Sequence, residues 1–320
     1  MLGWHLLVLL TSPVLLVFAA LAGIATRSSL PARTVMVLVA YAELELAAMV
    51  RIARLRALGG DGDWQELVGW FVESTYAVTR RVLDVAVQLE NGSARQEDVS
   101  GSPAGVVVLA RHCGPGDSLL IAWLLVVHYG LRLRVVLKSL LRLVPVIDLA
   151  GDALPFVFVG ARGLDARSGI AALARGLERG DGLLLFPEGQ NFSPRRWGDA
   201  LRKLAASGER LRLRRLRDNT KTLPPHVGGV TAALAAAPQA SVLLLAHTGL
   251  AGDGADRPWW RLPLHQDLTI RTMLIPAADV PRDPGRTSPW LDQKWTEIDA
   301  WVQGHAAERP FSDPSRDLTG

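Results

Sequence analysis

From Gly105 onward the chain alternates short apolar runs with longer segments of helical length, and this alternation limits its fold more than any other feature. The apolar runs have strand length and little polar interruption, which is typical of strands buried on both faces of a sheet. They occupy residues 106–110, 131–137, 156–161, 183–186 and 242–247, with segments of helical length between them at 117–129, 165–179 and 226–237. The sequence therefore predicts an α/β fold with a mostly parallel central sheet flanked by helices.

The segments around this alternating core predict a division into four parts. Residues 59–63 (GGDGD) break the chain, residues 64–90 are expected to form a helix, and residues 91–105 a polar loop. A further apolar run at 268–276 precedes a helix-like segment at 288–303. We expect a membrane-anchoring helical hairpin at 1–58, an α/β domain at 64–254, a strand–helix extension at 255–306 and a frayed tail at 307–320.

The N-terminal region predicts association with a membrane. Residues 1–26 contain no Asp, Glu, Lys or Arg, and about 20 apolar residues suffice to cross a bilayer. A secretory signal is the alternative, but no Lys or Arg precedes the apolar run. The second apolar stretch, 34–55, carries Glu43 and Glu45, which are costly in hydrocarbon, so we expect it to be interfacial or re-entrant. Arginines follow both stretches, and the positive-inside rule then places the body of the protein on the cytoplasmic face: Arg27, Arg33, Arg51, Arg54 and Arg56.

Charge and cysteine content narrow the range of functions. Cys113 is the only cysteine, so the sequence predicts no disulfide framework and no cysteine zinc site. The excess of basic residues is local: residues 195–217 hold nine Lys and Arg against Asp199 and Glu209. Such a run suits nucleic acid, a membrane surface or a phosphorylated substrate, or it is a solvated face. Few aromatic residues accompany it, so we expect no nucleic-acid partner.

The first motif for chemistry is the stretch ARHCGPGDSLLIAW, residues 110–123. His112 directly follows the strand at 106–110, and ligands of open α/β sheets bind at the carboxyl ends of the strands. Gly114 and Gly116 allow a tight turn, after which Asp117 begins a helix. The turn can bring the Asp117 carboxylate back to one ring nitrogen of His112, which fixes the tautomer and makes the other nitrogen a better base. Such a pair suits deprotonation of a substrate hydroxyl.

A second motif, FPEG at 186–189, ends another predicted strand. Pro187, Glu188 and Gly189 form the turn. The Glu188 carboxylate can bind a hydroxyl or orient a cation, and the Gly189 amide can approach a phosphate closely. A turn without a chemical role is the alternative.

The two motifs together, in this order and each after a strand, resemble those of the 1-acylglycerol-3-phosphate acyltransferase (lysophospholipid acyltransferase) family. The resemblance covers most of the chain and is nearest to the longer eukaryotic-like branch, because the apolar N-terminal pair and the segment after residue 267 fit that branch. It implies an α/β acyltransferase domain that moves a fatty acyl group from acyl-CoA, or acyl carrier protein, to a lysophospholipid hydroxyl. It implies no further cofactor and no metal, and leaves the oligomeric state open.

The resemblance also implies roles for single residues. His112 would be the general base and Asp117 its orienter, with direct attack on the thioester and no acyl-enzyme. Glu188 and Gly189 would hold the acceptor. The second-block basic residue that binds phosphate would be Arg162, with Arg167 as the alternative. Oxyanion or turn positions would be Gly114, Gly116 and Pro187.

The third motif of the family usually continues with Thr and Arg, where this chain has Gln190 and Asn191. Arg195 or Arg196 would then replace the missing guanidinium, or the acceptor would be a phosphodiester lysolipid or a glycolipid. The basic run would hold the enzyme on anionic lipid, at roughly 1 kcal/mol for each cation near the surface.

Two hypotheses from other classes remain. A catalytically silent lipid-binding or scaffold protein of the same fold would explain the altered third motif. A hydrolase with Cys113 as nucleophile would explain a thiol beside a histidine, but adjacent side chains rarely face each other in the geometry required.

Overall fold

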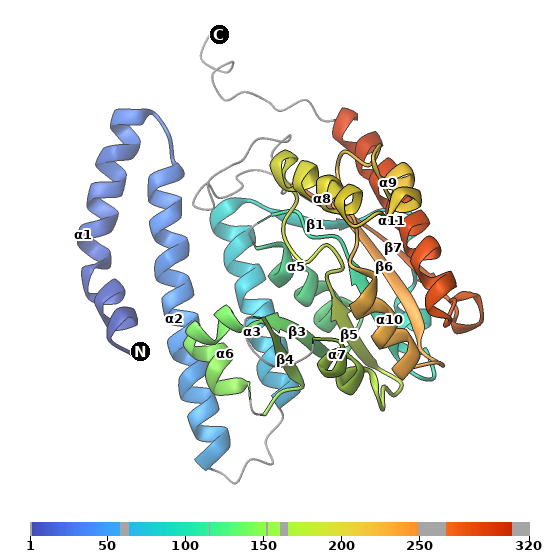
Figure 1. Ribbon diagram of the computed structural model, residues 1–320. Coiled ribbons are helices and arrows are strands. Elements are labelled where there is room, and N and C mark those ends of the chain that lie inside the picture. Colours follow the sequence, from blue (N-terminus) through green and yellow to red (C-terminus); the bar gives the residue numbers. More distant parts are fainter. Residues whose placement is uncertain are drawn as a thin grey trace.

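A single sheet organises the chain in the computed structural model, which describes residues 2–57, 64–114, 116–151, 153–160, 166–248 and 267–308 (Figure 1). Its strand order is β1-β7-β6-β2-β5-β3-β4. Neighbouring strands are parallel except β6 and β7, which pair antiparallel. The strands are β1 (Ala86–Leu89), β2 (Val106–Ala110), β3 (Arg132–Lys138), β4 (Phe156–Val159), β5 (Asp181–Leu185), β6 (Ser241–Thr248) and β7 (Asp267–Ile275). The predicted fold class is confirmed.

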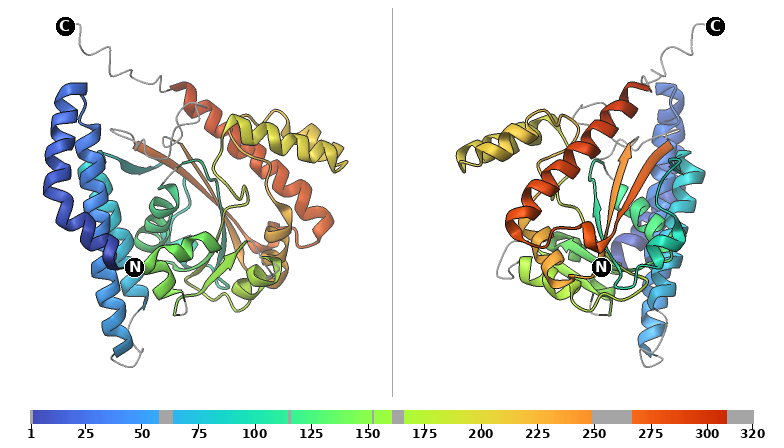
Figure 2. Two further views of the ribbon diagram at one scale, coloured as in Figure 1. Left: turned by 60° about the vertical axis from the view of Figure 1, so that its left-hand side comes forward. Right: turned by 90° about the vertical axis from the view of Figure 1, so that its right-hand side faces the viewer.

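Helices cover both faces of this sheet, as the turned views show (Figure 2). One face packs against α3 (Trp64–Val78), the π-helical turns η1 (Thr79–Leu83) and η2 (Leu124–His128), and α5 (Asp117–Trp123). The other packs against α7 (Ala166–Ala174), α10 (Val227–Ala236) and α11 (Pro284–Glu308). The remaining described helices after residue 57 are α4 (Gln96–Ser100), η3 (Ser139–Leu143), α6 (Pro145–Ala150), α8 (Pro194–Ala206), α9 (Arg210–Leu216) and η4 (Ala277–Asp279).

The central strand β2 explains why the apolar runs lack alternation. All five of its residues are buried. Val106 and Val108 contribute to the core beneath α5, whereas Val107 and Leu109 contribute to the core beneath α10 and α11. Successive side chains of a strand point to opposite faces, so a strand covered on both sides needs apolar residues at every position.

The N-terminal helices α1 (Leu2–Thr26) and α2 (Leu30–Ala57) lie side by side, with α1 on the outside of the molecule (Figures 1 and 2). Glu45 of α2 is buried and pairs with His5 of α1, whereas Glu43 is exposed. The carboxylate that made the second apolar stretch costly in hydrocarbon therefore faces a partner between the two helices. Within the described residues, Leu7–Thr26 is the one helical segment long and apolar enough to cross a membrane.

The prediction of one helix over residues 64–90 is wrong beyond Leu83. Asp84 adopts a left-handed conformation, with φ of 55°, and ends the helical stretch. Ala86–Leu89 then forms β1, which pairs with Asp267–Ile270 of β7. A four-residue strand at a sheet edge has little sequence signal of its own, and its partner lies about 180 residues away in the chain.

The segment predicted as an extension, 255–306, contributes to the same sheet and core. Its strand β7 lies between β1 and β6, and its helix α11 packs over β6. Arg212 of α9 donates to both oxygens of the buried Asp292 of α11 at 2.9–3.1 Å. This ion pair ties the basic run to the C-terminal helix.

Candidate active site

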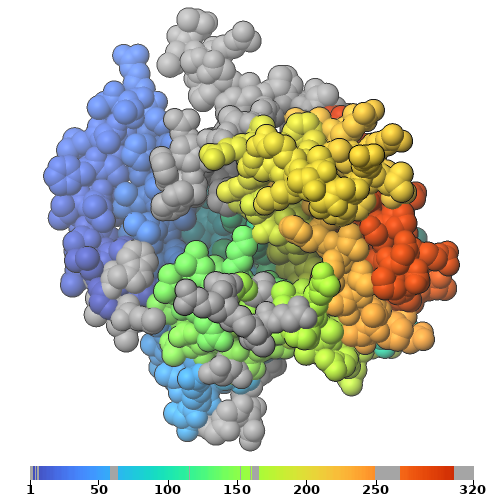
Figure 3. Space-filling view, in the orientation of Figure 1, coloured from blue at the N-terminus to red at the C-terminus, as the bar shows by residue number. Residues whose placement is uncertain are grey.

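Three neighbouring strands bring the candidate residues to one edge of the sheet. His112 follows β2, Pro187–Gly189 follows β5, and His247 lies near the end of β6, while the register pairs Leu109 of β2 with Leu185 and with Leu244. The carboxyl ends of β2, β5 and β6 are therefore level. In the space-filling view a hollow opens between the green segments and the yellow α8, with teal residues deeper inside (Figure 3).

His112 and Asp117 form the pair that the sequence predicts. The His112 Nδ1 atom lies 2.9 Å and 3.0 Å from the two Asp117 carboxylate oxygens. The His112 side chain is 20% exposed and that of Asp117 is fully buried. The ring also packs against Phe186, with ring centroids 4.7 Å apart. Because Nδ1 faces the carboxylate, Nε2 is the ring atom left to take a proton from a substrate.

The turn around Asp117 is built to hold that carboxylate ionised. Gly116 takes φ of 85°, which lets the chain reverse into α5. The Asp117 Oδ2 atom accepts the amides of Cys113 at 2.8 Å and Gly114 at 3.2 Å. Burial would raise the pKa of Asp117, but the hydrogen bond and charge of His112 and the Cys113 amide lower it below its usual value. The Gly114 amide is engaged by Asp117, although the sequence suggested it for an oxyanion or turn position.

Glu188 is fully engaged inside the protein. Its Oε1 accepts the His112 amide at 3.2 Å and its Oε2 accepts the Leu223 amide at 2.8 Å. Burial raises the pKa of Glu188 to about 7, against the charge of Arg111 and the two amides. The sequence suggested acceptor binding by this carboxylate, whereas its two oxygens connect the turn after β5 to the backbone of His112.

His226, which lies far from the FPEG motif in the sequence, packs against the turn after β5. Gly189 has φ of 67°, and a Cβ atom there would come within 3.1 Å of the His226 ring. The Pro187 carbonyl accepts the His226 amide at 2.8 Å. Gly189 is therefore required for its backbone conformation and for the close approach of His226.

The sequence analysis did not identify Arg111 and His247, two buried residues next to the His112–Asp117 pair. Arg111 donates from Nη1 to the His247 carbonyl at 2.6 Å and from Nη2 to the Lys221 carbonyl at 2.8 Å. His247 lies 3.7 Å from Asp117, measured from Nε2 to Oδ2. The sequence signal that could have identified them is a polar residue at the end of an otherwise apolar strand, which describes both Arg111 and His247.

The candidate phosphate-binding residues are distributed differently. Arg162 lies outside the described residues. Arg167, its alternative, packs against Gly228 at the start of α10, where a Cβ atom would come within 2.7 Å of Nε. Arg195 is exposed in the first turn of α8. Arg196 is also exposed, and its Nη1 donates to the Asn191 carbonyl at 3.0 Å.

The basic run forms α8 and α9 and divides into two groups. Arg212 is held by Asp292 and Glu209, and Arg202 pairs with Asp199. The other seven are exposed on the surface, where the space-filling view shows α8 beside the hollow: Arg195, Arg196, Lys203, Arg210, Arg214, Arg215 and Arg217 (Figure 3). Of these, Arg215 also lies 3.8 Å from Asp292, and Arg217 lies 3.7 Å from Asp218.

One cluster in the described part of the chain has the ligand types of a metal site: Cys113, Asp117 and His247. Their atoms are already engaged with one another and with backbone. The Cys113 Sγ lies 3.4 Å from His247 Nδ1, and His247 Nε2 lies 3.0 Å from the Arg111 carbonyl. We assign no metal to the cluster.

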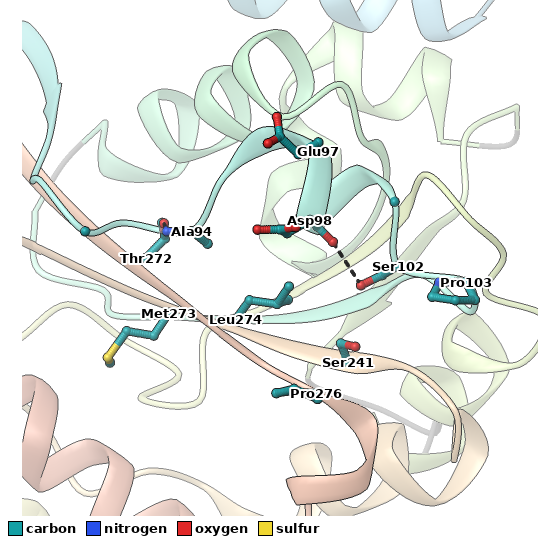
Figure 4. A pocket seen from close by; sticks show the side chains of 12 residues that line it. Ala94, Glu97, Asp98, Ser102, Pro103, Ser241, Thr272, Met273, Leu274 and Pro276 are labelled. Atoms are coloured by element: carbon teal, nitrogen blue, oxygen red, sulfur yellow. Dashed lines mark hydrogen bonds between the residues drawn. The ribbon is translucent and has the colours of Figure 1, made fainter.

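A surface depression of about 670 Å³ lies at the other end of the strands (Figure 4). It is lined by Ser241, the first residue of β6, by Leu274 near the end of the antiparallel β7, and by Asp98, which accepts a hydrogen bond from Ser102. It is separate from the His112–Asp117 pair.

A carboxylate-oriented histidine at the carboxyl edge of an α/β sheet has the geometry that general acid–base chemistry requires. Residues 87–245 match the family model described as Acyltransferase, a span that includes both motifs. The chain therefore belongs to the acyltransferase family and is an acyltransferase enzyme.

Comparison with solved structures finds the crystal structure of the 1-acyl-sn-glycerophosphate (LPA) acyltransferase PlsC from Thermotoga maritima. The match has 17% sequence identity and a TM-score of 0.49, and covers 84% of this chain and 97% of that one. Comparison with curated proteins finds no match to the sequence.

Proposed function

We propose that this acyltransferase moves a fatty acyl group from a thioester donor, acyl-CoA or acyl carrier protein, to the hydroxyl of a lysophospholipid such as lysophosphatidic acid. The observation that carries the proposal is the contact of 2.9 Å between His112 and the buried Asp117, within a chain of the acyltransferase family. The family membership supplies acyl transfer, and the apolar α1 and exposed cations of α8 and α9 favour a lipid acceptor.

The reaction follows from the pair. His112 Nε2 takes the proton of the acceptor hydroxyl as the oxygen attacks the thioester carbonyl carbon. Asp117 stabilises the resulting imidazolium through Nδ1. The tetrahedral intermediate collapses with cleavage of the carbon–sulfur bond, and the proton passes from His112 to the leaving thiolate. An ester and a free thiol are the products, and no acyl-enzyme forms.

A transfer assay tests this proposal. Purified protein in detergent receives labelled oleoyl-CoA and separate acceptors: lysophosphatidic acid, a phosphodiester lysolipid and a lysoglycolipid. We expect product with at least one acceptor, and the preferred acceptor reports what Gln190 and Asn191 select. A second arm replaces the donor by oleoyl acyl carrier protein. Absence of product in every combination would contradict the proposal.

The thiol of Cys113 is not expected to take part as a nucleophile. Its Sγ lies against His247, whose pKa burial lowers to about 4, so a neutral imidazole faces the thiol. We expect Cys113→Ser to keep kcat within about threefold, because a serine hydroxyl also donates to the ring nitrogen. Loss of transfer in a folded Cys113→Ser protein, measured in the same assay, would favour a cysteine nucleophile instead.

We further propose that α1 holds the enzyme on a membrane, with the catalytic domain on the cytoplasmic side. Large apolar side chains of α1 are exposed, among them Leu10 at 79% and Phe18 at 66%. Leu10→Lys combined with Phe18→Lys should reduce binding to vesicles of phosphatidylcholine and phosphatidylglycerol in a flotation assay, since each added charge opposes burial in lipid. Leu211→Lys, on exposed α9, is the control. Equal flotation of all three proteins would contradict this assignment of α1.

A further inference from the structure

The peptide bond before His112 is held at both ends by side chains from other strands. Its carbonyl, from Arg111, accepts a hydrogen bond from His247 Nε2 at 3.0 Å. Its N–H, from His112, donates to Glu188 Oε1 at 3.2 Å. The plane of a peptide group is rigid, so these two contacts orient the backbone from which the His112 side chain leaves.

The peptide bond after His112 is held in the same way. The His112 carbonyl accepts the Phe192 amide at 3.0 Å. The Cys113 N–H donates to Asp117 Oδ2 at 2.8 Å. Four groups therefore fix the backbone on both sides of the general base, and of these only Asp117 takes part in the proposed reaction itself.

At the end of the β2–β6 pairing, the side chain of His247 takes the place of a backbone N–H as hydrogen-bond donor. The Arg111 amide still donates to the Leu245 carbonyl of β6, at 3.0 Å. The next acceptor along β2 is the Arg111 carbonyl, and the imidazole of His247 supplies its donor. The link is reinforced from the other side, since Arg111 Nη1 donates to the His247 carbonyl at 2.6 Å.

The surroundings of His247 set its tautomer. A ring that donates from Nε2 to a carbonyl carries its proton there, which leaves the Nδ1 lone pair to accept. Cys113 Sγ lies 3.4 Å from that Nδ1 and is the donor. Burial, together with the charges of Arg111 and His112, lowers the pKa of His247 to about 4, although Asp117 opposes this. The ring thus stays neutral at neutral pH.

We infer that His247 is a positioning residue for acyl transfer: its Nε2–H holds the Arg111 carbonyl and thereby aims His112, and the Cys113 thiol keeps its tautomer. The inference rests on the proposed function, because part of its readout is the rate of transfer. It predicts that the donor at the Nε2 position matters, whereas the ring itself does not.

Replacement of His247 by Gln or by Asn tests the position of the hydrogen-bond donor separately from the presence of the ring. The amide nitrogen of Gln reaches the place of Nε2, whereas that of Asn reaches only the place of Nδ1. We expect His247→Gln to keep kcat within about threefold of the wild type. His247→Asn and His247→Leu should each lower kcat by about 100-fold with little change in KM, which is the cost of misplacing a reacting group by about 1 Å. All proteins are compared at temperatures well below their measured unfolding temperatures.

A spectroscopic readout does not depend on transfer. Long-range ¹H–¹⁵N correlation spectra of the histidine rings should show wild-type His247 protonated at Nε2 from pH 5 to 8. In the wild type, neutral His112 should be protonated at Nδ1. The His247→Gln variant should keep this tautomer of His112, whereas the His247→Asn variant should lose it. Leu244→Ala on β6 is the control for loss of stability alone, because this side chain packs in the opposite core; it should lower the unfolding temperature but leave kcat and the His112 spectrum unchanged.

The inference is overturned if His247→Asn keeps wild-type kcat and an unchanged His112 spectrum, or if His247→Gln loses as much kcat as His247→Asn. If the wild type transfers acyl groups to no acceptor, the proposed function fails, and the His112 spectra of the Gln and Asn variants alone decide the positioning role. If His247→Leu does not fold, the Gln and Asn pair still decides it.

Discussion

His112→Ala is expected to lower kcat for acyl transfer by about 10²–10⁴-fold, the usual contribution of a positioned general base. The ring is the group that Asp117 orients, at 2.9 Å, and alanine leaves no base to take the hydroxyl proton. The rate is measured with labelled oleoyl-CoA and the preferred acceptor. The fold should persist, because the His112 side chain is partly exposed and its backbone contacts to Glu188 and Phe192 remain.

His128→Ala is the matched control for this experiment. His128 ends the helical stretch that Asp117 begins and therefore lies at the far end from His112. Its replacement should leave kcat near the wild-type value. If His112→Ala retains wild-type transfer while its unfolding temperature is unchanged, the general-base mechanism is wrong.

Glu188→Ala is expected to lower the free energy of unfolding by about 2–6 kcal/mol. The substitution leaves the amides of His112 and Leu223 without their acceptor, and each buried unsatisfied group costs about 1–3 kcal/mol. Glu188→Gln retains one carbonyl acceptor and should lose less. Denaturant unfolding of the three proteins in the same detergent measures the differences. Equal stability of Glu188→Ala and the wild type would contradict the role of Glu188 as the acceptor that connects the backbone at His112 with the backbone at Leu223.

The same carboxyl predicts a dependence on pH. Burial raises the pKa of Glu188 from 4.5 to about 7, so the folded state binds more protons than the unfolded state between these values. The stability that Glu188 contributes is therefore present at low pH and lost as pH rises through this window. Relative to the wild type, Glu188→Gln should gain roughly 3 kcal/mol between pH 4.5 and 7, at 1.36 kcal/mol for each pKa unit. A constant difference across this range would show that the Glu188 pKa is not raised.

The parts of the fold that sequence analysis predicted are those with a strong local pattern. The predicted runs 106–110, 183–186 and 242–247, which form most of β2, β5 and β6, are apolar at nearly every position, as strands covered on both faces require. The His112–Asp117 pair was predictable for a similar reason, since the four residues between them include two glycines and allow the turn to bring the two side chains together.

The missed element β1 shows where local pattern fails. Residues 86–89 follow a true helix without a Gly or Pro, so their sequence fits a continuing helix as well as a strand. They form a strand because they pair with the edge of β7. The four residues themselves carry no information about that edge, which lies about 180 residues away in the chain. The position of β7 between β1 and β6, antiparallel to β6, was unpredictable for the same reason.

The roles of Glu188, Arg111 and His247 depended on the tertiary structure. Sequence by itself determined the class of fold, the family resemblance and the contact between His112 and Asp117, because these follow from periodicity, from motifs and from contacts within one turn. The order β6-β2-β5 then placed a carboxylate from residue 188 and an imidazole from residue 247 on either side of the His112 backbone. Only the tertiary structure could decide that arrangement, because hydrogen bonds between residues more than 70 positions apart exist only once the strands have paired.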